Sequence, residues 1–516
     1  MFQRIRSIAL HGIKAMPVEI EVDSSPGLPG FTLVGLPDNA VRESRERVVS
    51  AMRCSGFHCE ASRMTVNMSP ADLRKEGTAF DLGLAVGMLA ATTQIADCKL
   101  EDFVFLGELS LDGRLRSVRG VLAAAAFLKL HFHSSILVVP NENRAEATAV
   151  KGLRVLAPKT LKECLNQLQE PKPAFLSCAE KSSALAVTSE IPDFSQVYGM
   201  SGVKRALEIS AAGAHNFLLV GSPGSGKTLC ARCLPGILPA MRRSEALETT
   251  IIHSCAGTLA ENCGLMENRP FRAPHHTATM AALIGGMKLR PGEASLAHNG
   301  VLFLDELPEF QRAALESLRQ PLEEGVVRLT RAVGNIELPA SFVLGAAMNP
   351  CPCGYAMDTR RDCRCLPDMV KRYRSRVSGP LLDRIDLQVS VPSVPLDESR
   401  SKGAGECSAE IQKRVESACE IQETRFRFQI AKNNDAYPTK RNGLLSGKQI
   451  KEILFWTEET EGFSIKAAEK WQMSHRAYDR MLKVARTIAD LRGEKKVERV
   501  DLAEAIQYRA LENVWR

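Results

Sequence analysis

Aromatic side chains are scarce in this chain and make up only 5 % of its 516 residues. Such a low content argues against base stacking as the main mode of any nucleic-acid binding. Long apolar runs are also missing: the best candidate, residues 82–92, is shorter than the roughly 18 residues that span a bilayer. Residues 1–20 lack the apolar region and the small-residue cleavage site of a secretory signal. We therefore expect a cytoplasmic protein without a membrane partner.

A strong charge of one sign is absent as well, because the formal net charge is only +7. At this length, only local clusters of charge can indicate a partner. The fifteen cysteines would suggest disulfides in a small secreted protein. In a large intracellular chain we expect most of them to be reduced and buried.

The pattern of residues divides the chain into four parts. Residues 1–165 alternate strand-like and Ala-rich helical runs, which predicts an α/β or α+β domain. Residues 166–192 are rich in Pro, Lys, Glu and Ser without a sustained period, so they predict a linker. In residues 193–395 strands alternate with helices, and residues 396–516 read mostly as helices. The predicted fold class is therefore α/β, with a helical C-terminal domain.

Residues 221–228 read GSPGSGKT and follow a short apolar run, residues 217–220. This is the complete phosphate-binding pattern, in which glycines let backbone N–H groups converge on phosphate oxygens ahead of a helix N-terminus. Lys227 would neutralise the β- and γ-phosphates, and the Thr228 hydroxyl would hold Mg²⁺. The alternative is a fortuitous Gly-rich turn. The predicted ATP ligands are Gly221, Ser222, Pro223, Gly224, Ser225, Gly226, Lys227 and Thr228, together with Asp305.

Two further strands end in polar residues that suit the same chemistry. The run VLFL at residues 301–304 is followed by Asp305 and Glu306. An acid at this place holds Mg²⁺, and the next acid polarises the attacking water. The run 342–348 ends in Asn349, whose amide would orient that water. The alternatives are a solvated strand end for the acids and an Asn-Pro turn for Asn349.

The order of these motifs, followed by LLDRID at residues 381–386, resembles the AAA+ ATPases. The resemblance is to the branch that includes Mg chelatase ATPase subunits and MCM helicases. It implies that Arg384 is a finger that reaches the γ-phosphate of a neighbouring subunit, and that Arg476 is a second sensor in the C-terminal helical lid. It also implies a ring, usually a hexamer. The alternative for Arg384 is a salt bridge to Asp383 or Asp386.

Four cysteines lie within fifteen residues, in the pattern CxC-x9-CxC. Four thiolates at this spacing suit a tetrahedral, structural Zn²⁺. Reduced or disulfide-linked cysteines and an iron–sulfur cluster are the alternatives. The candidate zinc ligands are Cys351, Cys353, Cys363 and Cys365.

A basic stretch surrounds this cluster and leads into the Arg384 motif. Its members are Arg360, Arg361, Arg364, Lys371, Arg372, Arg374 and Arg376. A run of this kind is either a solvated face or a surface for nucleotide, a neighbouring subunit or nucleic acid. Residues 326–338 predict a β-hairpin, and by resemblance to MCM-like rings Arg331 near its tip is a candidate for touching DNA. The alternative is a surface hairpin.

Adjacent histidines at positions 275 and 276 invite a metal interpretation. On extended backbone neighbouring side chains point to opposite sides, so they rarely share one ion. We therefore expect residues 269–277 to belong to an inserted loop and not to a metal site.

The N-terminal domain resembles the domain fused to the AAA+ module in the ComM/YifB family, which has a Lon-protease-like (S5-type) α+β fold. The matching stretches are residues 75–81 and 106–114. Lon proteases use a Ser-Lys pair, but this chain has Ala79 at the serine position and Leu122 where the lysine would follow. The resemblance therefore implies a domain without peptidase activity.

Taken together, these features predict an ATP-dependent AAA+ motor with ATP, Mg²⁺ and a structural Zn²⁺ as cofactors. The family resemblance implies a hexameric helicase on single-stranded or branched DNA that promotes branch migration during recombination in natural transformation. A Mg chelatase-type motor that remodels a protein partner is the main alternative. An ATP-dependent protease and a non-motor ATP switch are the others.

Overall fold

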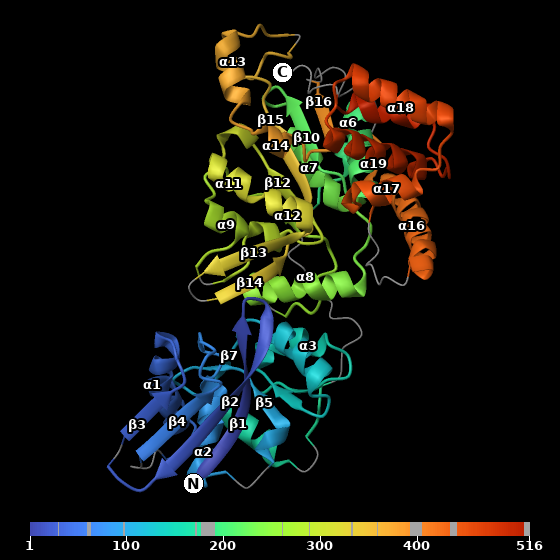
Figure 1. The fold of residues 1–516 in the computed structure, drawn as a ribbon. Helices are drawn as coiled ribbons and strands as arrows, with labels where there is room; N and C mark the ends of the chain where they lie inside the picture. The colour runs from blue at the N-terminus through green and yellow to red at the C-terminus, as the bar shows by residue number, and fades with distance from the viewer. Residues whose placement is uncertain are drawn as a thin grey trace.

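The computed structural model places an N-terminal domain beneath a central α/β core, with a helical lid at one side of that core (Figure 1). The described residues are 1–28, 30–58, 63–95, 99–170, 173–176, 191–260, 262–287, 289–331, 334–358, 360–392, 405–433 and 441–509.

A seven-stranded mixed sheet, in the order β3-β4-β2-β1-β5-β8-β9, forms the N-terminal domain. Its strands are β1 (Phe2–His11), β2 (Lys14–Ser25), β3 (Gly30–Val34), β4 (Arg63–Ser69), β5 (Phe103–Phe105), β8 (Ile136–Val138) and β9 (Arg154–Leu156). A small two-stranded sheet pairs β6 (Glu108–Leu109) with β7 (Leu115–Arg116). The helices are α1 (Asn39–Cys54), α2 (Asp81–Ala91), α3 (Val121–His131), α4 (Arg144–Thr148) and α5 (Leu161–Gln169).

Helix α2 explains why its sequence reads as an uninterrupted apolar run. Every residue of α2 is buried, and a helix that is apolar on all sides belongs in a core. It packs against β1 and β2, so the apolar run serves the domain core. Among the described residues, no helix combines the length and the apolar character that a membrane span requires.

Helix α5 spans the predicted end of the first domain at residue 165. The helix continues to Gln169, and Leu165 and Leu168 bury their side chains in the domain core. Of the expected linker 166–192, residues 171–172 and 177–190 lie outside the described residues.

The central α/β core is built on a five-stranded parallel sheet in the order β11-β12-β15-β10-β16. The strands are β10 (Phe217–Gly221), β11 (Phe271–Arg272), β12 (Val301–Leu304), β15 (Val343–Met348) and β16 (Leu387–Val391). The core helices are α6 (Ser201–Gly213), α7 (Lys227–Cys233), α8 (Arg243–Ala256), α9 (Met280–Ile284), α10 (Glu293–Leu296), α11 (Arg312–Ser317), α12 (Arg319–Glu324), α13 (Pro367–Arg374) and α14 (Gly379–Leu382). This order places β10, β15 and β12 side by side. The polar residues that follow them therefore meet at one edge of the sheet.

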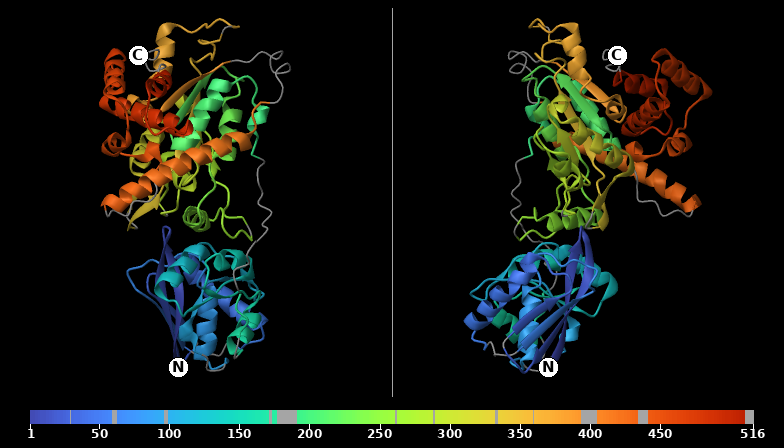
Figure 2. Two further views of the ribbon diagram at one scale, coloured as in Figure 1. Left: turned by 90° about the vertical axis from the view of Figure 1, so that its right-hand side faces the viewer. Right: turned by 60° about the vertical axis from the view of Figure 1, so that its left-hand side comes forward.

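The hairpin predicted at residues 326–338 is present as β13 (Val326–Arg331) paired with β14 (Gly334–Pro339). Its end lies against the N-terminal domain and not in open solvent (Figures 1 and 2). A Cβ on Gly12, in the β1–β2 turn, would lie 2.8 Å from Cδ1 of Ile336, and one on Gly334 would lie 3.0 Å from the His11 ring. The β1–β2 turn therefore abuts this hairpin.

A second contact joins the two domains through α8. Cys255 of α8 is buried in the same apolar cluster as α3. Beside it, the Ser254 hydroxyl accepts a hydrogen bond from the Gly120 N–H at 3.0 Å and donates one to the Glu146 carboxylate. Burial raises the pKa of Glu146. The domains thus share a packed and hydrogen-bonded contact.

The C-terminal part of the chain is helical, as expected. It comprises α16 (Ser408–Asn433), α17 (Gly447–Ile453), α18 (Glu458–Lys470), α19 (His475–Leu491) and α20 (Arg499–Gln507). Helices α16 and α19 both pack against α6 of the core. Lid and core therefore share one apolar cluster.

Candidate nucleotide and metal sites

The GSPGSGKT segment forms a loop between β10 and α7, as its sequence predicts. Gly224 has a φ of 74° and Gly226 a φ of 84°, values that residues with a Cβ rarely adopt. No described heavy atom lies within 4 Å of where a Cβ on Gly224 would sit. The loop therefore leaves open space over the N-terminus of α7, where a phosphate chain fits.

Lys227 joins the loop to the strand that ends at Asn349. Its buried ammonium donates to the carbonyl oxygens of Gly221 and Ser222 at 2.8 and 2.9 Å and to Oδ1 of Asn349 at 3.2 Å. Burial lowers the pKa of Lys227, while Asp305 and Glu306 act in the opposite direction. A cation held this way, with acids close by, is placed for an anionic ligand.

Thr228 and Asp305 meet directly: the hydroxyl donates to Oδ2 of Asp305 at 2.7 Å. A hydroxyl and a carboxylate at this spacing are the oxygen ligands that Mg²⁺ takes in phosphoryl-transfer sites. The donor set therefore fits the metal expected from the sequence.

Glu306 lies beside the metal ligands in a left-handed conformation, with a φ of 53°. Its side chain is 58 % exposed, and one carboxylate oxygen lies 3.3 Å from Nδ1 of His276. The sequence does not predict this contact. The rings of His275 and His276 are 4.0 Å apart, so the expectation that they point to opposite sides is wrong. Strand β11 ends at Arg272, and the histidines lie in irregular backbone where alternation does not apply.

Arg384 and Arg476 converge on one carboxylate that the sequence does not indicate. Both donate to Oε1 of Glu323 on α12, at 2.5 Å from Arg384 and 2.7 Å from Arg476. The side chain of Arg384 is only 7 % exposed, whereas that of Arg476 is 50 % exposed.

The alternative partners considered for Arg384 are not the ones it uses. Asp386 is paired with Arg480 at 2.6 Å and lies 3.7 Å from His215. The salt bridge of Arg384 is formed with Glu323 and not with Asp383 or Asp386, the alternative partners. That residue is distant in sequence and is brought close only by the packing of α12.

The four clustered cysteines come together as one group, with all four Sγ atoms within 4.8 Å of one another. Three of the Sγ–Sγ distances are 3.3, 3.6 and 3.6 Å. A tetrahedral zinc with Zn–S bonds of about 2.3 Å needs sulfur atoms about 3.8 Å apart. The four are free thiols, so this thiol set fits a structural zinc ion.

The thiols differ in how readily they ionise. Burial raises the pKa of Cys351 to about 12. Backbone N–H groups of Tyr355 and Arg364 lower the pKa of Cys353 to about 6. A bound cation would favour the thiolate form at each ligand.

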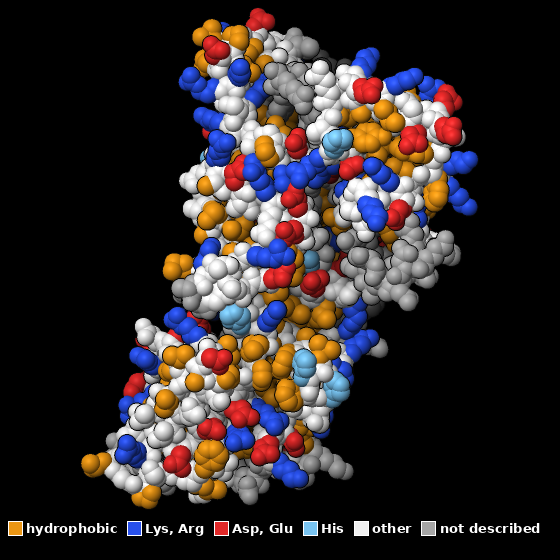
Figure 3. Space-filling model, in the orientation of Figure 1, with side chains coloured by type: hydrophobic (Ala, Val, Ile, Leu, Met, Phe, Trp, Pro, Cys, Tyr) orange, Lys and Arg blue, Asp and Glu red, His pale blue; other side chains and the backbone are white. Residues whose placement is uncertain are grey.

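The basic stretch next to the cysteines is mostly exposed, at the end of the core away from the N-terminal domain (Figure 3). Arg376 pairs with Glu309 at 2.9 Å, and Arg361 lies over the Tyr355 ring at 5.2 Å. Leu366 and Met369 expose apolar side chains beside these groups. The surface is therefore basic and partly apolar.

Known proteins match this chain along almost its whole length. The profile described as "Magnesium chelatase, subunit ChlI" matches residues 193–399, "Subunit ChlI of Mg-chelatase" matches 20–143, and the ChlI C-terminal profile matches 405–509. "Competence protein ComM" of Haemophilus influenzae is 43 % identical over 511 residues, which cover 98 % of this chain and 97 % of the relative. The chain belongs to the ComM/YifB family.

Two YifB proteins show a similar degree of likeness to this ComM/YifB chain. The one from Salmonella typhimurium is 40 % identical and the one from Escherichia coli 39 % identical. Each alignment covers 99 % of this chain and 97 % of the relative. The family assignment therefore rests on full-length matches, and its ATPase core is of the Mg chelatase AAA+ type.

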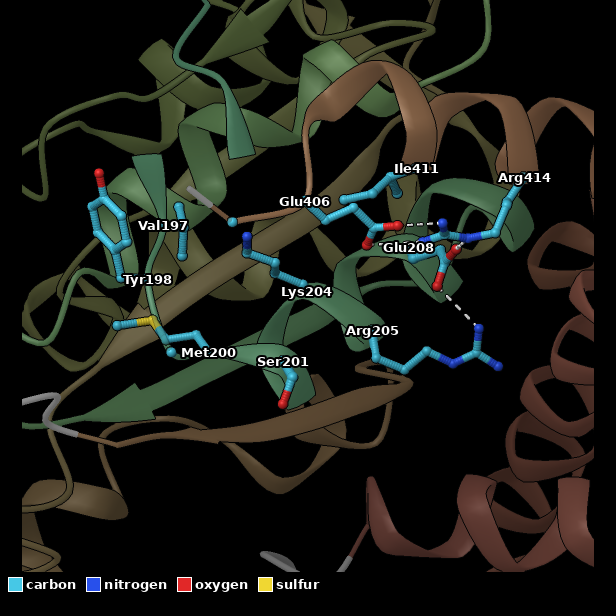
Figure 4. A pocket seen from close by; sticks show the side chains of 12 residues that line it. Val197, Tyr198, Met200, Ser201, Lys204, Arg205, Glu208, Glu406, Ile411 and Arg414 are labelled. Atoms are coloured by element: carbon cyan, nitrogen blue, oxygen red, sulfur yellow. Dashed lines mark hydrogen bonds and ion pairs between the residues drawn. The ribbon is translucent and has the colours of Figure 1, made fainter. Parts of the chain in front are cut away.

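A pocket of about 500 Å³ lies beside the phosphate-binding loop and was not anticipated from the sequence (Figure 4). Residues 197–201, Lys204 and the start of the lid at Glu406 contribute to its lining. Met200 connects the pocket to the loop, because its Sδ lies 3.7 Å from Sγ of Cys230 on α7. Two segments about 200 residues apart form this space, so no local pattern could have indicated it.

In the N-terminal domain of this ComM/YifB chain, Ala79 and Leu122 lie in apolar surroundings. Leu122 is completely buried, and Ala79 packs against the apolar cluster that contains Val121. Neither side chain carries a nucleophile or a base.

Proposed function

We propose that this protein hydrolyses ATP as a hexameric AAA+ ring that acts on DNA and promotes branch migration during recombination in natural transformation. One observation carries the ATPase part: the contacts of Lys227 with Asn349 and of Thr228 with Asp305 unite three motifs in one site. Other observations support the DNA part and the ring.

The site residues would divide the work of hydrolysis among them. Lys227 and the backbone of the loop would bind the phosphates, while Thr228 and Asp305 would hold Mg²⁺, which neutralises developing charge on the phosphoryl oxygens. Glu306 would take a proton from the attacking water, and Asn349 would orient that water. The adjoining pocket, which residues 197–201 help to line, would receive the adenine base of ATP.

Two arginines of this subunit support the proposed ring. Arg384 and Arg476 share Glu323 as a partner, so one rearrangement would release both. A guanidinium delivered from a neighbour stabilises the transferring phosphoryl group and makes hydrolysis depend on assembly. We therefore assign both arginines to a nucleotide bound by an adjacent subunit.

One basic surface and the name of one relative support a nucleic-acid substrate. Exposed side chains around the cysteine cluster carry an excess of Arg and Lys, as phosphate binding requires. The name of the Haemophilus relative, a competence protein, also points to DNA.

We further propose a Lon-protease-like fold without peptidase activity for residues 1–165, because the dyad positions hold Ala79 and Leu122.

The test is the ATPase rate of the purified protein with single-stranded, duplex and branched DNA and without DNA. We expect branched or single-stranded DNA to stimulate turnover of the wild type, and Lys227→Ala to show no turnover under any condition. If no form of DNA binds or raises turnover, the DNA function is wrong while the ATPase assignment stands.

A Mg chelatase-type motor that remodels a protein is the second candidate. It is favoured by one observation: all three matching profiles describe the ChlI subunit of magnesium chelatase. Turnover that responds to a protein partner and to no form of DNA would support it.

A further inference from the structure

The cysteine cluster and the phosphate-binding loop are in direct contact, although about 130 residues separate them in the sequence. Gly354, between the two CxC pairs, is buried, with a φ of 85°. A Cβ at this position would lie 2.4 Å from Cδ and 2.6 Å from Cγ of Pro223. Pro223 is the third residue of the GSPGSGKT motif, so the backbone of the cluster lies against the loop with no room for a side chain.

An electrostatic interaction accompanies this contact. The Asp358 carboxylate accepts from the Arg360 N–H at 2.8 Å, and its side chain is only 4 % exposed. The bond from the Arg360 N–H lowers the pKa of Asp358, and the Ser222 side chain of the loop contributes to the same shift. Asp358 therefore lies close enough to Ser222 to interact with the loop.

The cluster also adjoins the residue that contacts Lys227. Cys351 follows Asn349 by two residues and is fully buried. The carbonyl of Pro350, between them, accepts from Arg374 at 3.1 Å. Fixing Cys351 to a metal would therefore fix the backbone that carries Asn349 as well as the backbone that supports Pro223.

Few other elements hold residues 351–365 in place. In its described residues, the segment contains no helix or strand. Four ligands on one ion would supply the cross-links that regular secondary structure supplies elsewhere. Without the ion, Gly354 and Asp358 would lose the fixed geometry that their contacts with the loop require.

We propose that a divalent, thiophilic metal bound by Cys351, Cys353, Cys363 and Cys365 holds the phosphate-binding loop in its binding conformation through Gly354 and Asp358, so that metal binding and nucleotide binding are coupled. Gly354 and Asp358 are positioning residues in this arrangement. The inference rests on the proposed nucleotide site but not on DNA or on the ring.

Coupling of this kind is reciprocal, which gives two independent measurements. Metal-free protein should bind a fluorescent ADP analogue about tenfold more weakly than protein loaded with Zn²⁺, a size typical of coupled sites. In the reverse direction, saturating Mg-ADP should raise the affinity for Zn²⁺ by the same factor. This second effect is followed as equilibrium transfer of zinc to a chromogenic chelator that leaves Mg²⁺ bound.

Variants that retain all four thiols distinguish a loss of coupling from a loss of the metal. Gly354→Ala should retain zinc, as elemental analysis would show, yet weaken ADP binding, because its Cβ cannot fit against Pro223. Gly493→Ala is the matched control: its φ is 78°, but no described heavy atom lies within 4 Å of its Cβ position. Asp358→Asn should act in the same direction as Gly354→Ala. Asp362→Asn, an exposed acid of the same segment, should leave affinity unchanged.

Each outcome supports or overturns the coupling. Equal ADP affinity with and without zinc, or in Gly354→Ala and Gly493→Ala, overturns it while leaving the nucleotide site intact. Failure of the four thiols to take up zinc also overturns it. Absence of ADP binding in every form, including zinc-loaded wild type, would instead overturn the proposed ATPase function. If metal removal unfolds the protein, ADP binding by zinc-loaded Gly354→Ala and Asp358→Asn still tests the coupling.

Discussion

Two buried lysines show how differently the two halves of the molecule use similar groups. Lys227 in the ATPase core donates to backbone carbonyls but also faces Asn349, Asp305 and Glu306. Lys75 in the N-terminal domain is buried too, and its ammonium donates to the carbonyl of Pro70. Burial lowers the pKa of both.

What separates the two lysines is the chemistry around them. Around Lys227 several polar groups from different strands converge. In the N-terminal domain, by contrast, Ala79 and Leu122 contribute only apolar side chains. A buried cation marks a reactive site only where further polar groups share the same space. The same reasoning predicts how each half responds to substitution.

The largest effect is expected from Lys227→Ala. Removing a charged donor that contacts the phosphates in both ground and transition states should lower ATP turnover by about 10³-fold or more. Lys75→Met is the control, since it removes a lysine that is also buried, from the other domain. Turnover per folded molecule should stay at the wild-type level in Lys75→Met, while thermal stability falls. A comparable loss of turnover in both variants would remove the distinction between the two lysines.

Arg384→Ala should lower the turnover of assembled protein by about 10²-fold, because one donor to the transferring phosphoryl group is lost. Nucleotide affinity should change little if the arginine serves a neighbouring subunit. Mixing Arg384→Ala with Lys227→Ala subunits would then restore part of the activity, since some interfaces receive one intact half from each. No recovery on mixing would contradict action between subunits.

Leu122→Lys combined with Ala79→Ser places the Lon residue types back into the N-terminal domain. We expect no peptidase activity and a loss of about 3 kcal/mol or more in the free energy of unfolding, because a lysine at a fully buried apolar position is uncompensated. Denaturant unfolding and a casein-cleavage assay measure the two outcomes. Cleavage would show that the domain retains a latent active-site geometry.

The smallest effect concerns Asp193, where the ATPase core begins. Its carboxylate accepts from the N–H groups of Ser195 at 2.7 Å and Ser408 at 3.0 Å, so it links the core to the lid. Burial opposes ionisation, but these hydrogen bonds prevail and lower the pKa of Asp193 to about 2. Asp193→Ala should cost about 1 kcal/mol at neutral pH.

The pH dependence of that difference follows from the lowered pKa. The stabilising contribution of the carboxylate is fully present above the ordinary aspartate pKa of about 3.9 and is lost as pH falls through about 2. Wild type and variant should therefore converge in stability on acidification. A difference that persists at about pH 2 would show that ionisation of Asp193 contributes nothing.

Much of the ATPase site was predictable because its motifs are local. The GSPGSGKT loop, the acids after 301–304 and the amide at Asn349 each follow a short apolar strand. Parallel strands bring their carboxyl ends to one edge, so Asn349 was expected at the same site as the loop and the acids. The thiol cluster was also predictable from the two CxC pairs, because four cysteines within fifteen residues are necessarily close in space.

Other features could not be read from the chain. Glu323 has no motif, yet it is the shared partner of Arg384 and Arg476. His276 reaches Glu306 only because the chain leaves extended geometry after β11. The hairpin β13–β14 was predicted, but its contact with the β1–β2 turn depends on how two domains dock.

The sequence by itself determined the local motifs of this protein: a phosphate-binding loop, paired acids after a buried strand, and a thiol cluster. These depend on residue type and on spacing within a few turns of chain. The tertiary structure alone decided which of these features touch. The thiol cluster touches Pro223, and two arginines share one glutamate, only because segments far apart in the chain pack together. Local sequence patterns do not predict such long-range contacts.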